Sequence, residues 1–366
     1  MVKIQTYTIS DLRRLLNPGP WFAGDPIPIT RERALSQINN PRADESDVVL
    51  LVAYDGDVVV AHLGVVPDLA FTSTGQNKVG WLTAWWANPD RKYSGAGMML
   101  MMRAMALYKN GAGASGFSED AKKVYAATRK FTTIKELPGI SAFTKFDASH
   151  LLPKRFPALR RITFGLEFAD AVANQFVRIR QALWRRQQKI PQGVRIEYVP
   201  ELDFEAEQFI AKNNTNEFAR RGAGELNWIG KYSWMTRAPL GDPPAFRFAT
   251  TASSNRCFHL KIYDGAAGLV AVVMLSIIDD HLIIPCCHHR DRGELVARII
   301  GHHLAVLRVK RVTTYRDDLV KNFSRLRFPW VWSANKTRSW IMAGTCVAGQ
   351  PAFDVQDGDG DCAFTV

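Results

Sequence analysis

The chain has 366 residues, well beyond an ordinary domain of about 150 residues, so two domains are expected. Hydrophobic residues make up 47% of the sequence and charged residues 22%, proportions that are typical of globular proteins and exclude a disordered or fibrous chain. The 47 lysines and arginines exceed the 35 aspartates and glutamates, and the net charge of +12 favours an anionic partner such as a nucleotide, a phosphorylated carrier, nucleic acid or anionic lipid.

The cellular location is predicted from the first residues and the cysteines. Residues 1–10 alternate like a strand and contain no apolar block before a cleavage site, so no signal peptide is expected. The apolar run at 268–278 is far shorter than the roughly 20 residues of a transmembrane helix, and its β-branched residues favour a buried strand. The five cysteines are an odd number, which favours reduced thiols and a cytoplasmic protein.

The first half begins with a predicted strand pair. Residues 47–66 contain two β-rich runs that flank Asp55 and Gly56, a dipeptide typical of a tight hairpin turn. A third strand is predicted at 79–87, because Pro89 cannot continue a paired strand. An antiparallel sheet is therefore expected in this part of the chain.

The turn at 91–97 connects the third strand to a predicted buried helix at 98–107, which contains no helix-breaking residue. The free N–H groups of a first helical turn converge on one point and favour an anion there. Gly95 and Gly97 let the backbone approach such an anion closely, because neither residue has a Cβ atom. An anion site is predicted, although a plain loop that begins a helix with glycine fits the same residues.

A short strand at 114–117 is followed by a predicted helix at 118–131. Ser118 can cap this helix, and Tyr125 lies on its apolar face. A core tyrosine with a hydrogen-bonded hydroxyl is the commoner outcome for a single residue of this kind. A proton donor is the alternative.

The order of these elements resembles the GCN5-related N-acetyltransferases. In that family the fourth strand is followed by a loop of the pattern P-x-x-[RQ]-x-x-G-x-[GA], and residues 89–97, PDRKYSGAG, match it in length, with Lys92 at the Arg/Gln position and Tyr93 in place of a glycine. The helix with Ser118 and Tyr125 resembles the family's Asn-x-x-Ala-x-x-hydrophobic-Tyr helix, with serine in place of asparagine. The resemblance implies an α/β (α+β) fold, a mixed and mostly antiparallel sheet flanked by helices.

The resemblance also implies that acetyl-CoA is the co-substrate. In the family the loop amides hold the pyrophosphate, the end of the fourth strand flanks the pantetheine arm, and the tyrosine protonates the departing CoA thiolate. The residues that correspond to the binding site in this chain are Trp85, Trp86, Ala87, Lys92, Tyr93, Ser94, Gly95, Ala96, Gly97 and Ser118. Tyr125 corresponds to the catalytic acid, since a donor that stabilises the leaving thiolate lowers the barrier to transfer.

A general base is harder to predict. Many members of the family use a carboxylate on the fourth strand, but residues 81–86 contain none. His62 on the adjacent strand is the candidate, although a lone histidine on a strand is more often structural. Asp68 and Asp90 are weaker candidates.

The second half repeats the first. The pattern Tyr-Asp-Gly recurs at 263–265 between two β-rich runs, and the strands and helices that follow keep the order of the first half. The corresponding loop at 285–295, PCCHHRDRGEL, lacks the paired small residues, and Phe323 stands at the position of Tyr125. A tandem protein is predicted whose C-terminal copy is degenerate, with a single acetyl-CoA site in the first copy.

Two groups of residues have side chains of the kind that bind metals, but no metal is expected. The cysteines and histidines at 286–289 are adjacent, so they face opposite sides of a strand and lack zinc-site spacing. Asp357, Asp359 and Asp361 resemble the start of a calcium loop, but Cys362 stands where glycine is needed. A solvated acidic tail is expected at 346–366.

A helix is predicted between the two copies, because apolar residues recur at helical spacing from 168 to 183. Arg178, Arg185 and Arg186 give it positive charge. Core packing with a solvated face is the usual interpretation. The alternative is a surface that binds anionic lipid or a phosphorylated acceptor, so weak association with a membrane surface is kept open.

Four parts are therefore predicted: a catalytic domain at 1–165, a basic amphipathic helical linker at 166–193, a degenerate copy at 194–345 and the acidic tail at 346–366. The predicted activity is acetyl-CoA-dependent acylation of a primary amine on a small acceptor, and an amino sugar or nucleotide-linked amino sugar fits the positive charge. Two alternatives remain: a Fem-like aminoacyl transferase that uses charged tRNA and a lipid-linked acceptor, and a non-catalytic module that binds CoA. Nucleic acid is expected as a partner only in the first alternative.

Overall fold

The computed structural model describes residues 2–17, 21–22, 25–73, 75–237, 246–248, 251–307, 309–347 and 353–364. The chain forms two compact units. Unit 1 contains Met1–Glu136, Pro200–Phe258 and Arg338–Val366, and unit 2 contains Leu137–Val199 and His259–Thr337. The units are interleaved along the sequence and do not coincide with the predicted boundaries, because residues from the second half of the chain complete unit 1.

The sheet of unit 1 has the strand order β1-β2-β3-β4-β5-β14. Its strands are β1 (Lys3–Thr8), β2 (Val48–Asp55), β3 (Val58–Thr72), β4 (Gly75–Ala87), β5 (Ala112–Ser115) and the end of β14 (Trp332–Ala343). Strands β1 to β4 are antiparallel neighbours, β4 and β5 are parallel, and residues 340–343 of β14 pair antiparallel with β5. The mixed, mostly antiparallel sheet that the sequence predicted is confirmed.

The predicted hairpin is also confirmed. Strands β2 and β3 are joined at Gly56 and Asp57, and Gly56 has a φ of +61°, a conformation that glycine adopts without strain. The third predicted strand is the second half of β4, which ends before Pro89. The buried helix begins two residues earlier than predicted, at Ala96.

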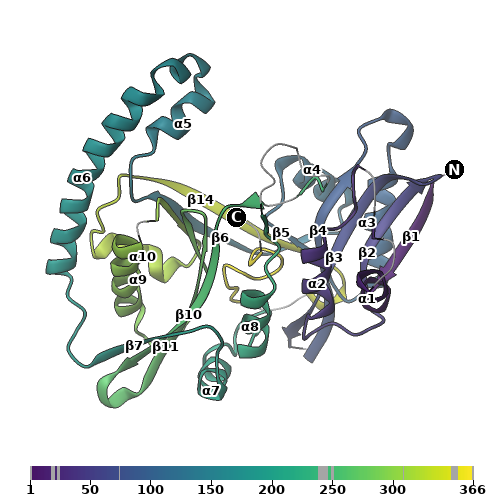
Figure 1. Cartoon of the computed structure of the whole chain (residues 1–366). Coiled ribbons are helices and arrows are strands. Elements are labelled where there is room, and N and C mark those ends of the chain that lie inside the picture. The colour runs from purple at the N-terminus through teal and green to yellow at the C-terminus, as the bar shows by residue number, and fades with distance from the viewer. Residues whose placement is uncertain are drawn as a thin grey trace. The chain divides into compact units, whose positions relative to one another are not determined.

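Helices cover both faces of this sheet (Figure 1). On one face, α3 (Ala96–Leu107) packs through Leu100 against Leu51. On the other face, α1 (Ile9–Leu16) and α2 (Arg31–Ile38) pack through Leu12 and Ala34 against Leu50. Neighbouring strand residues such as Leu50 and Leu51 point to opposite faces, which is why β2 is apolar throughout.

Further elements complete unit 1. They are α4 (Glu119–Thr128), α7 (Phe204–Asn213), α8 (Ala223–Lys231) and the short pair β8 (Thr236–Arg237) and β9 (Thr251–Ala252). The predicted helix at 118–131 is therefore present as α4, with Ser118 as its N-cap.

The C-terminal segment contradicts the prediction of a solvated tail. Its described residues 355–364 are buried, including Asp357, Asp359 and Asp361. The segment is held by hydrogen bonds from the buried guanidinium of Arg221 to the carbonyl oxygens of Gly358 and Gly360, at 2.6 and 2.9 Å. The alternation of Asp and Gly, which is typical of a solvated segment, forms a tight, hydrogen-bonded turn inside unit 1.

Unit 2 repeats the order of elements found in unit 1. Its sheet contains the end of β6 (Thr132–Phe143), then β13 (Arg311–Thr314), β12 (His281–His289), β11 (Leu269–Ile278), β10 (Asn255–Asp264) and β7 (Val194–Val199). The order β10, β11, β12, α9 (Gly293–Leu307), β13, α10 (Asp317–Arg325) corresponds to β2, β3, β4, α3, β5, α4, and β12 pairs parallel with β13 as β4 does with β5. The run at 268–278 is the fully buried strand β11, as predicted.

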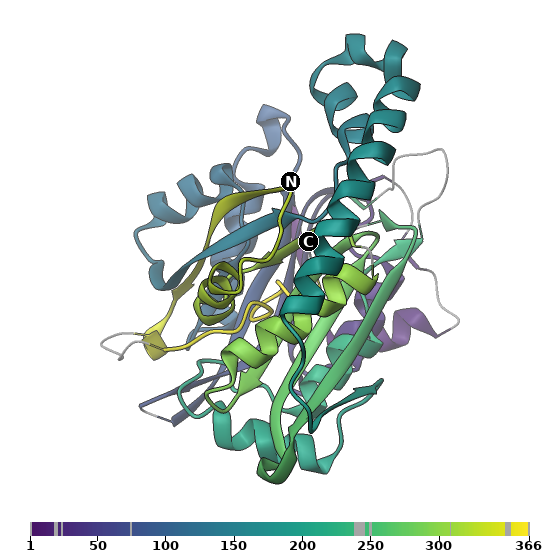
Figure 2. The same cartoon turned by 90° about the vertical axis from the view of Figure 1, so that its left-hand side faces the viewer.

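The predicted linker helix is α6 (Thr163–Gln187), which follows α5 (Ala148–Arg155) and a 3₁₀ turn at Pro157–Ile162. Trp184 of α6 packs against Phe328 and donates a hydrogen bond from Nε1 to the carbonyl oxygen of Leu326 at 2.8 Å. Figure 2 shows α6 passing α9 within unit 2. The helix is therefore part of unit 2 and does not lie between two independent domains.

All five cysteines are free thiols. In the ranges given above, no helix combines the length and the apolar composition that crossing a bilayer requires.

Candidate active site

A cavity of about 400 Å³ opens in unit 1 where β4 and β5 separate. The two strands pair only through Gly80 with Ala112 and Trp81 with Gly113. Beyond this point β4 contains a bulge, because its register with β3 shifts and Ala84 has a φ of +49°. Bulges bend a strand and redirect its side chains, so β4 turns away from β5 and leaves space between them.

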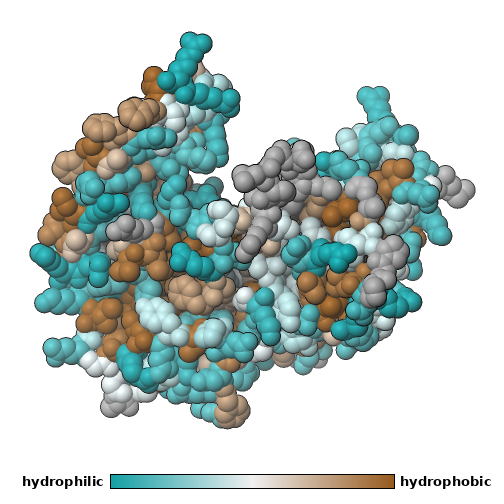
Figure 3. All heavy atoms as spheres, in the orientation of Figure 1, coloured by the Kyte–Doolittle hydropathy of each residue, from teal (hydrophilic) through white to brown (hydrophobic). Residues whose placement is uncertain are grey.

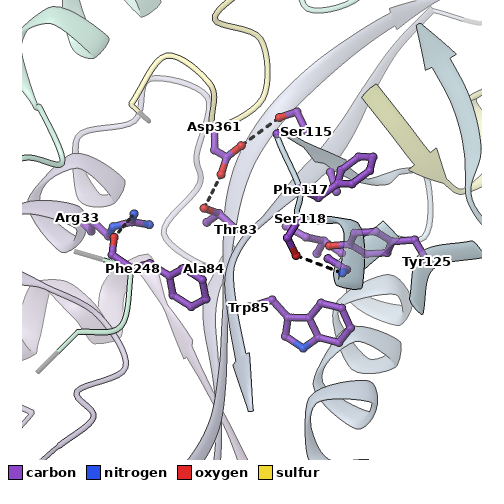
Figure 4. A pocket seen from close by; sticks show the side chains of 14 residues that line it. Arg33, Thr83, Ala84, Trp85, Ser115, Phe117, Ser118, Tyr125, Phe248 and Asp361 are labelled. Atoms are coloured by element: carbon purple, nitrogen blue, oxygen red, sulfur yellow. Dashed lines mark hydrogen bonds between the residues drawn. The ribbon is translucent and has the colours of Figure 1, made fainter. Parts of the chain in front are cut away.

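Residues from distant parts of the chain line this cavity (Figure 4). Strand β4 contributes Thr83 and Trp85, and the segment after β5 contributes Ser115 and Phe117. The remaining polar side chains are Arg33 from α2, Ser118 at the N-cap of α4, Tyr125 from α4, and Asp361 from the C-terminal segment. Every lining residue belongs to unit 1.

Tyr125 is held on the wall of the cavity by other aromatic rings. Its ring lies 4.7 Å from that of Phe131, 5.5 Å from that of Phe117 and 5.7 Å from that of Trp85, measured between centroids. The hydroxyl of Ser118 accepts a hydrogen bond from the amide of Ala121 at 3.2 Å and so begins α4 beside the cavity. Burial raises the pKa of the Tyr125 phenol, which is therefore protonated and able to donate at neutral pH.

Trp85 connects the cavity to the glycine-bearing loop. Its indole Nε1 donates a hydrogen bond to the carbonyl oxygen of Gly97 at 3.0 Å. A Cβ atom at Gly97 would lie 3.0 Å from this nitrogen and 3.1 Å from the Cβ of Ala87, so a larger residue would push these neighbours away and glycine favours the close packing of α3 on β4. Of the predicted pantetheine residues, Trp85 and Ala87 thus lie next to the loop, whereas Trp86 stacks on His62 at 5.6 Å.

The loop leaves fewer free amides than the sequence predicted. The amide of Lys92 donates to Oδ1 of Asp90, that of Tyr93 to the carbonyl oxygen of Asp90, and that of Ser94 to the carbonyl oxygen of Arg91. Within the described part of the chain, the amides of Gly95, Ala96 and Gly97 donate no hydrogen bond to the backbone. They form the N-terminal end of the 12-residue helix α3, where the helix dipole favours negative charge.

Asp361 is the carboxylate that sequence reasoning missed. It is 8% exposed, and its carboxylate accepts hydrogen bonds from the hydroxyls of Thr83 at 2.6 Å and Ser115 at 3.0 Å. These two hydrogen bonds connect β4 and the end of β5 to the C-terminal segment. Burial raises the pKa of Asp361 above its usual range, and the two hydroxyls and Arg33 offset part of this shift.

A buried ion network fixes the segment that contains Asp361. Arg221, which binds Gly358 and Gly360, also pairs with Asp68 at 2.9 Å, and Asp68 pairs with Arg42 at 2.6 Å. The two guanidinium groups hold the pKa of Asp68 below its usual value despite burial. Asp68 is therefore a structural anion and not a candidate base, in contrast to the prediction from the sequence.

His62 lies outside the lining of the cavity. Its ring is fully buried between Trp86 and Phe246, with centroids 5.6 Å away on either side. Burial lowers the pKa of His62 to about 4, so the ring is neutral at pH 7. Asp90 lies on the exposed loop, where its carboxylate caps the 3₁₀ turn at Arg91–Tyr93.

In unit 2, phenylalanine stands at the position that corresponds to Tyr125. Phe323 of α10 is buried against Phe328 and Trp330, with ring centroids 6.3 and 5.5 Å away. His289 at the end of β12 contacts Asp318 through Nε2 at 2.5 Å. Among the described residues, no group of three or more His, Cys, Asp or Glu side chains is arranged to hold a metal ion.

No family model matches the sequence, and no curated protein matches it. Solved structures resemble the fold. A conserved protein of unknown function from Enterococcus faecalis, described as a probable N-acyltransferase, has a TM-score of 0.51 and 10% identity, with 95% of this chain and 73% of that chain covered. A tandem GNAT protein from the clavulanic acid biosynthesis pathway has a TM-score of 0.48 and 13% identity, with 94% and 98% covered.

A GCN5-related N-acetyltransferase from Anabaena variabilis has a TM-score of 0.47 and 10% identity, with 95% of this chain and 73% of that chain covered. Identities this low relate folds and do not carry an activity from one protein to another. The chain therefore shares its overall fold with the Enterococcus faecalis protein.

Proposed function

We propose that the chain is an acyl-CoA-dependent N-acyltransferase that transfers an acetyl group from acetyl-CoA to the primary amine of a small acceptor. The observation that carries this proposal is that a buried carboxylate, Asp361, and a protonated phenol, Tyr125, line one cavity. Amine acylation needs both a proton acceptor and a proton donor. The Enterococcus faecalis protein that shares this fold is described as a probable N-acyltransferase, which agrees with the proposal but does not carry it.

The co-substrate is bound by unit 1. The free amides of Gly95, Ala96 and Gly97 receive the pyrophosphate, and the exposed side chains of Arg91 and Lys92 add positive charge nearby. The pantetheine arm extends along the end of β4 past Trp85, so the thioester enters the cavity beside Tyr125. The residues present fit this ligand. The free amides at the start of α3 suit the phosphates, and the apolar side chain of Trp85 at the end of β4 suits the pantetheine arm.

The transfer is a direct attack of the amine on the thioester. The acceptor nitrogen attacks the carbonyl carbon of the acetyl group while Asp361 takes a proton from the nitrogen. The carbon–sulfur bond of the tetrahedral intermediate then breaks, and Tyr125 gives its proton to the leaving thiolate. The products are the N-acetylated acceptor and CoA, and proton exchange with water restores both side chains.

His62 has no part in this scheme, because it lies outside the cavity lining and is fully buried. The amino sugar or nucleotide-linked amino sugar stays a prediction from the sequence. The cytoplasmic location is likewise a prediction. The Fem-like and CoA-binding alternatives are outcomes of the test below.

The test is calorimetric titration with acetyl-CoA followed by an assay of CoA thiol release with a panel of primary amines. We expect one equivalent bound per chain and thiol release that depends on the amine. Ser94 is exposed on the loop, so Ser94→Asp adds a negative charge beside the phosphate site and should weaken binding at least about tenfold, whereas Ser94→Ala should not. No binding of acetyl-CoA by the unmodified protein refutes the proposal, and binding without transfer to any amine supports a CoA-binding module instead.

A further inference from the structure

The cavity contains a buried cation in addition to Asp361 and Tyr125. Arg33 of α2 is 5% exposed, and its guanidinium lies over the rings of Trp234, at 4.2 Å from the centroid, and Phe246, at 4.9 Å. Within the described residues its guanidinium makes one hydrogen bond, from Nη2 to the carbonyl oxygen of Phe248 at 3.3 Å. Burial lowers the pKa of Arg33 to about 10, so the group remains charged at neutral pH.

Such an arrangement leaves most of the guanidinium donors available. A guanidinium has five N–H groups, and removing it from water is unfavourable unless an anion or several acceptors compensate. The two aromatic faces fix its plane and supply no acceptor. Its edge therefore suits an anion that accepts two parallel hydrogen bonds, which is the geometry of a carboxylate.

Figure 4 shows Arg33 and Phe248 to one side of β4 and Trp85 and Tyr125 to the other, with Asp361 bonded to Thr83 and Ser115. We propose that Arg33 binds the carboxylate of the acceptor while Asp361 receives its amine, so that the acceptor is a zwitterionic amine of the amino-acid type. The inference rests on the proposed function and specifies its acceptor.

The charges of the cavity favour this class over the other amines. A zwitterion places its cation at Asp361 and its anion at Arg33, so both buried charges are compensated. A simple amine binds Asp361 but brings no anion that could accept hydrogen bonds from the guanidinium of Arg33. A phosphorylated amine adds a second negative charge that the described lining does not match, because Arg33 is the one basic side chain in it.

The test compares pairs of acceptors that differ only at the carboxylate: α-amino acids and their methyl esters, assayed by thiol release from acetyl-CoA. The measured quantity is the ratio of kcat/KM for acid over ester in the unmodified protein and in Arg33→Met. Comparing this ratio between the two proteins removes the intrinsic difference in amine basicity. Met has a similar length and fits between the aromatic rings, and Arg33→Lys keeps the charge.

We expect the ratio to fall about 10- to 100-fold in Arg33→Met, since hydrogen bonds to charged groups contribute that much, and to be partly kept in Arg33→Lys. Binding of acetyl-CoA should be unchanged in both variants, with thermal melting as the control for folding. An unchanged ratio, or transfer to esters and simple amines only, overturns this inference and leaves the proposed function in place. Failure to bind acetyl-CoA removes the proposed function and this inference with it.

A separate feature is the outer face of α6 in unit 2. Phe164, Phe168, Val172, Phe176, Ile179 and Leu183, here called the outer α6 stripe, are between 45% and 84% exposed. At 3.6 residues per turn these side chains fall within an arc of about 120°. The buried residues of the helix, Asp170, Val177, Gln181 and Trp184, lie on the opposite side. Figure 3 shows apolar side chains gathered along this helix.

Basic side chains border the outer α6 stripe. Arg178 and Arg180 are exposed on either side of it. Along the border of Arg178 lies a pocket of about 200 Å³ that is also lined by Lys145 and Arg185. An apolar face with cations at its edges matches the surface of an anionic bilayer, in which acyl chains lie below phosphate groups.

We infer that the outer α6 stripe docks the protein on an anionic membrane surface. The test is co-sedimentation of the full chain with phosphatidylcholine vesicles that contain about 30% phosphatidylglycerol, and with vesicles of phosphatidylcholine alone. We expect binding to the anionic vesicles, weakened by salt, and loss of most binding in the double variant Phe168→Ser/Phe176→Ser. Val58→Ser changes an apolar residue of similar exposure in unit 1 and should have no effect.

The same proteins are compared by sedimentation velocity without lipid. Equal binding of the double variant and the unmodified protein overturns the inference. The inference is also overturned if the unmodified protein does not bind vesicles and forms a dimer, whereas the double variant is a monomer. The outer α6 stripe would then be an interface between two copies of the chain.

Discussion

Replacement of Asp361 by asparagine tests the base of the proposed reaction. Asparagine has nearly the same shape, and its amide can exchange hydrogen bonds with Thr83 and Ser115, so the C-terminal segment should keep its position. What is lost is the capacity to accept a proton from the acceptor nitrogen. The expected effect is therefore on turnover and not on the binding of acetyl-CoA, whose predicted phosphate site is at Gly95 to Gly97.

The magnitude follows from the role. General acid–base catalysis contributes about 10²- to 10⁴-fold, which corresponds to about 3 to 5 kcal/mol in activation free energy. Burial raises the pKa of Asp361, so in the unmodified protein kcat/KM should rise with pH as this carboxyl loses its proton, at a pH above the ordinary value of 3.8. Steady-state turnover from pH 5 to 9 measures both effects, and this carboxylate-dependent rise should be missing in Asp361→Asn.

Asp359→Asn is the matched control, because Asp359 is a buried acid of the same segment that does not line the cavity. Its activity should stay within about threefold of the unmodified protein. If Asp361→Asn keeps full turnover, or if both variants lose the same activity, Asp361 is not the base and the loss reflects the fold of the segment.

Three further predictions concern the donor, the buried acid and the ion network. Tyr125→Phe should lower kcat about 10²- to 10⁴-fold and leave the Kd of acetyl-CoA nearly unchanged, since the ring remains and only the proton donor is lost; equal turnover of the two proteins would remove Tyr125 from the mechanism. Burial raises the pKa of Asp359 to about 6 from 3.8, so its contribution to the free energy of unfolding falls as pH rises between these values. The stability of Asp359→Asn relative to the unmodified protein should therefore increase by about 2 kcal/mol from pH 4 to 7 in urea unfolding, and a constant difference would contradict the shift. Arg221→Ala should destabilise unit 1 by about 3 to 5 kcal/mol because it leaves Asp68 partly unpaired in the interior, whereas Arg13→Ala at the exposed pair with Glu45 should change stability by less than about 1 kcal/mol; similar values for both would show that the network is not structural.

The parts of the site that the sequence predicted are local in the chain. The strand that ends before Pro89, the glycine turn, α3 and α4 lie between residues 75 and 128, and near neighbours specify them: Pro89 for the strand end, Gly95 and Gly97 for the turn, Ser118 for the cap. Short-range rules of turns and caps are sufficient for such features.

Arg33 and Asp361 could not be found in this way. Their positions depend on contacts across more than two hundred residues, such as the hydrogen bond from Thr83 to Asp361. The sequence held one indirect signal. The predicted acyltransferase site has no carboxylate on 81–86, whereas the last described segment, 353–364, contains four aspartates. The acidic pattern of those residues led to the opposite prediction, because burial of a carboxylate requires partners that the local sequence does not reveal.

The residues proposed to bind CoA and those proposed to bind the acceptor come from different parts of the chain. The groups proposed for CoA, Trp85, Gly95 to Gly97 and Tyr125, come from one continuous stretch of the chain, whereas Arg33 and Asp361, proposed for the acceptor, come from α2 and the C-terminal segment. A change of acceptor therefore requires substitutions only in these outlying segments, while the loop and strand that bind the thioester stay as they are. It follows that Arg33 and Asp361 variants should alter kcat and the choice of amine at constant affinity for acetyl-CoA, and Ser94 variants should do the reverse. If variants of both sets changed the affinity for acetyl-CoA and the choice of amine together, the cavity would bind its two substrates through shared side chains.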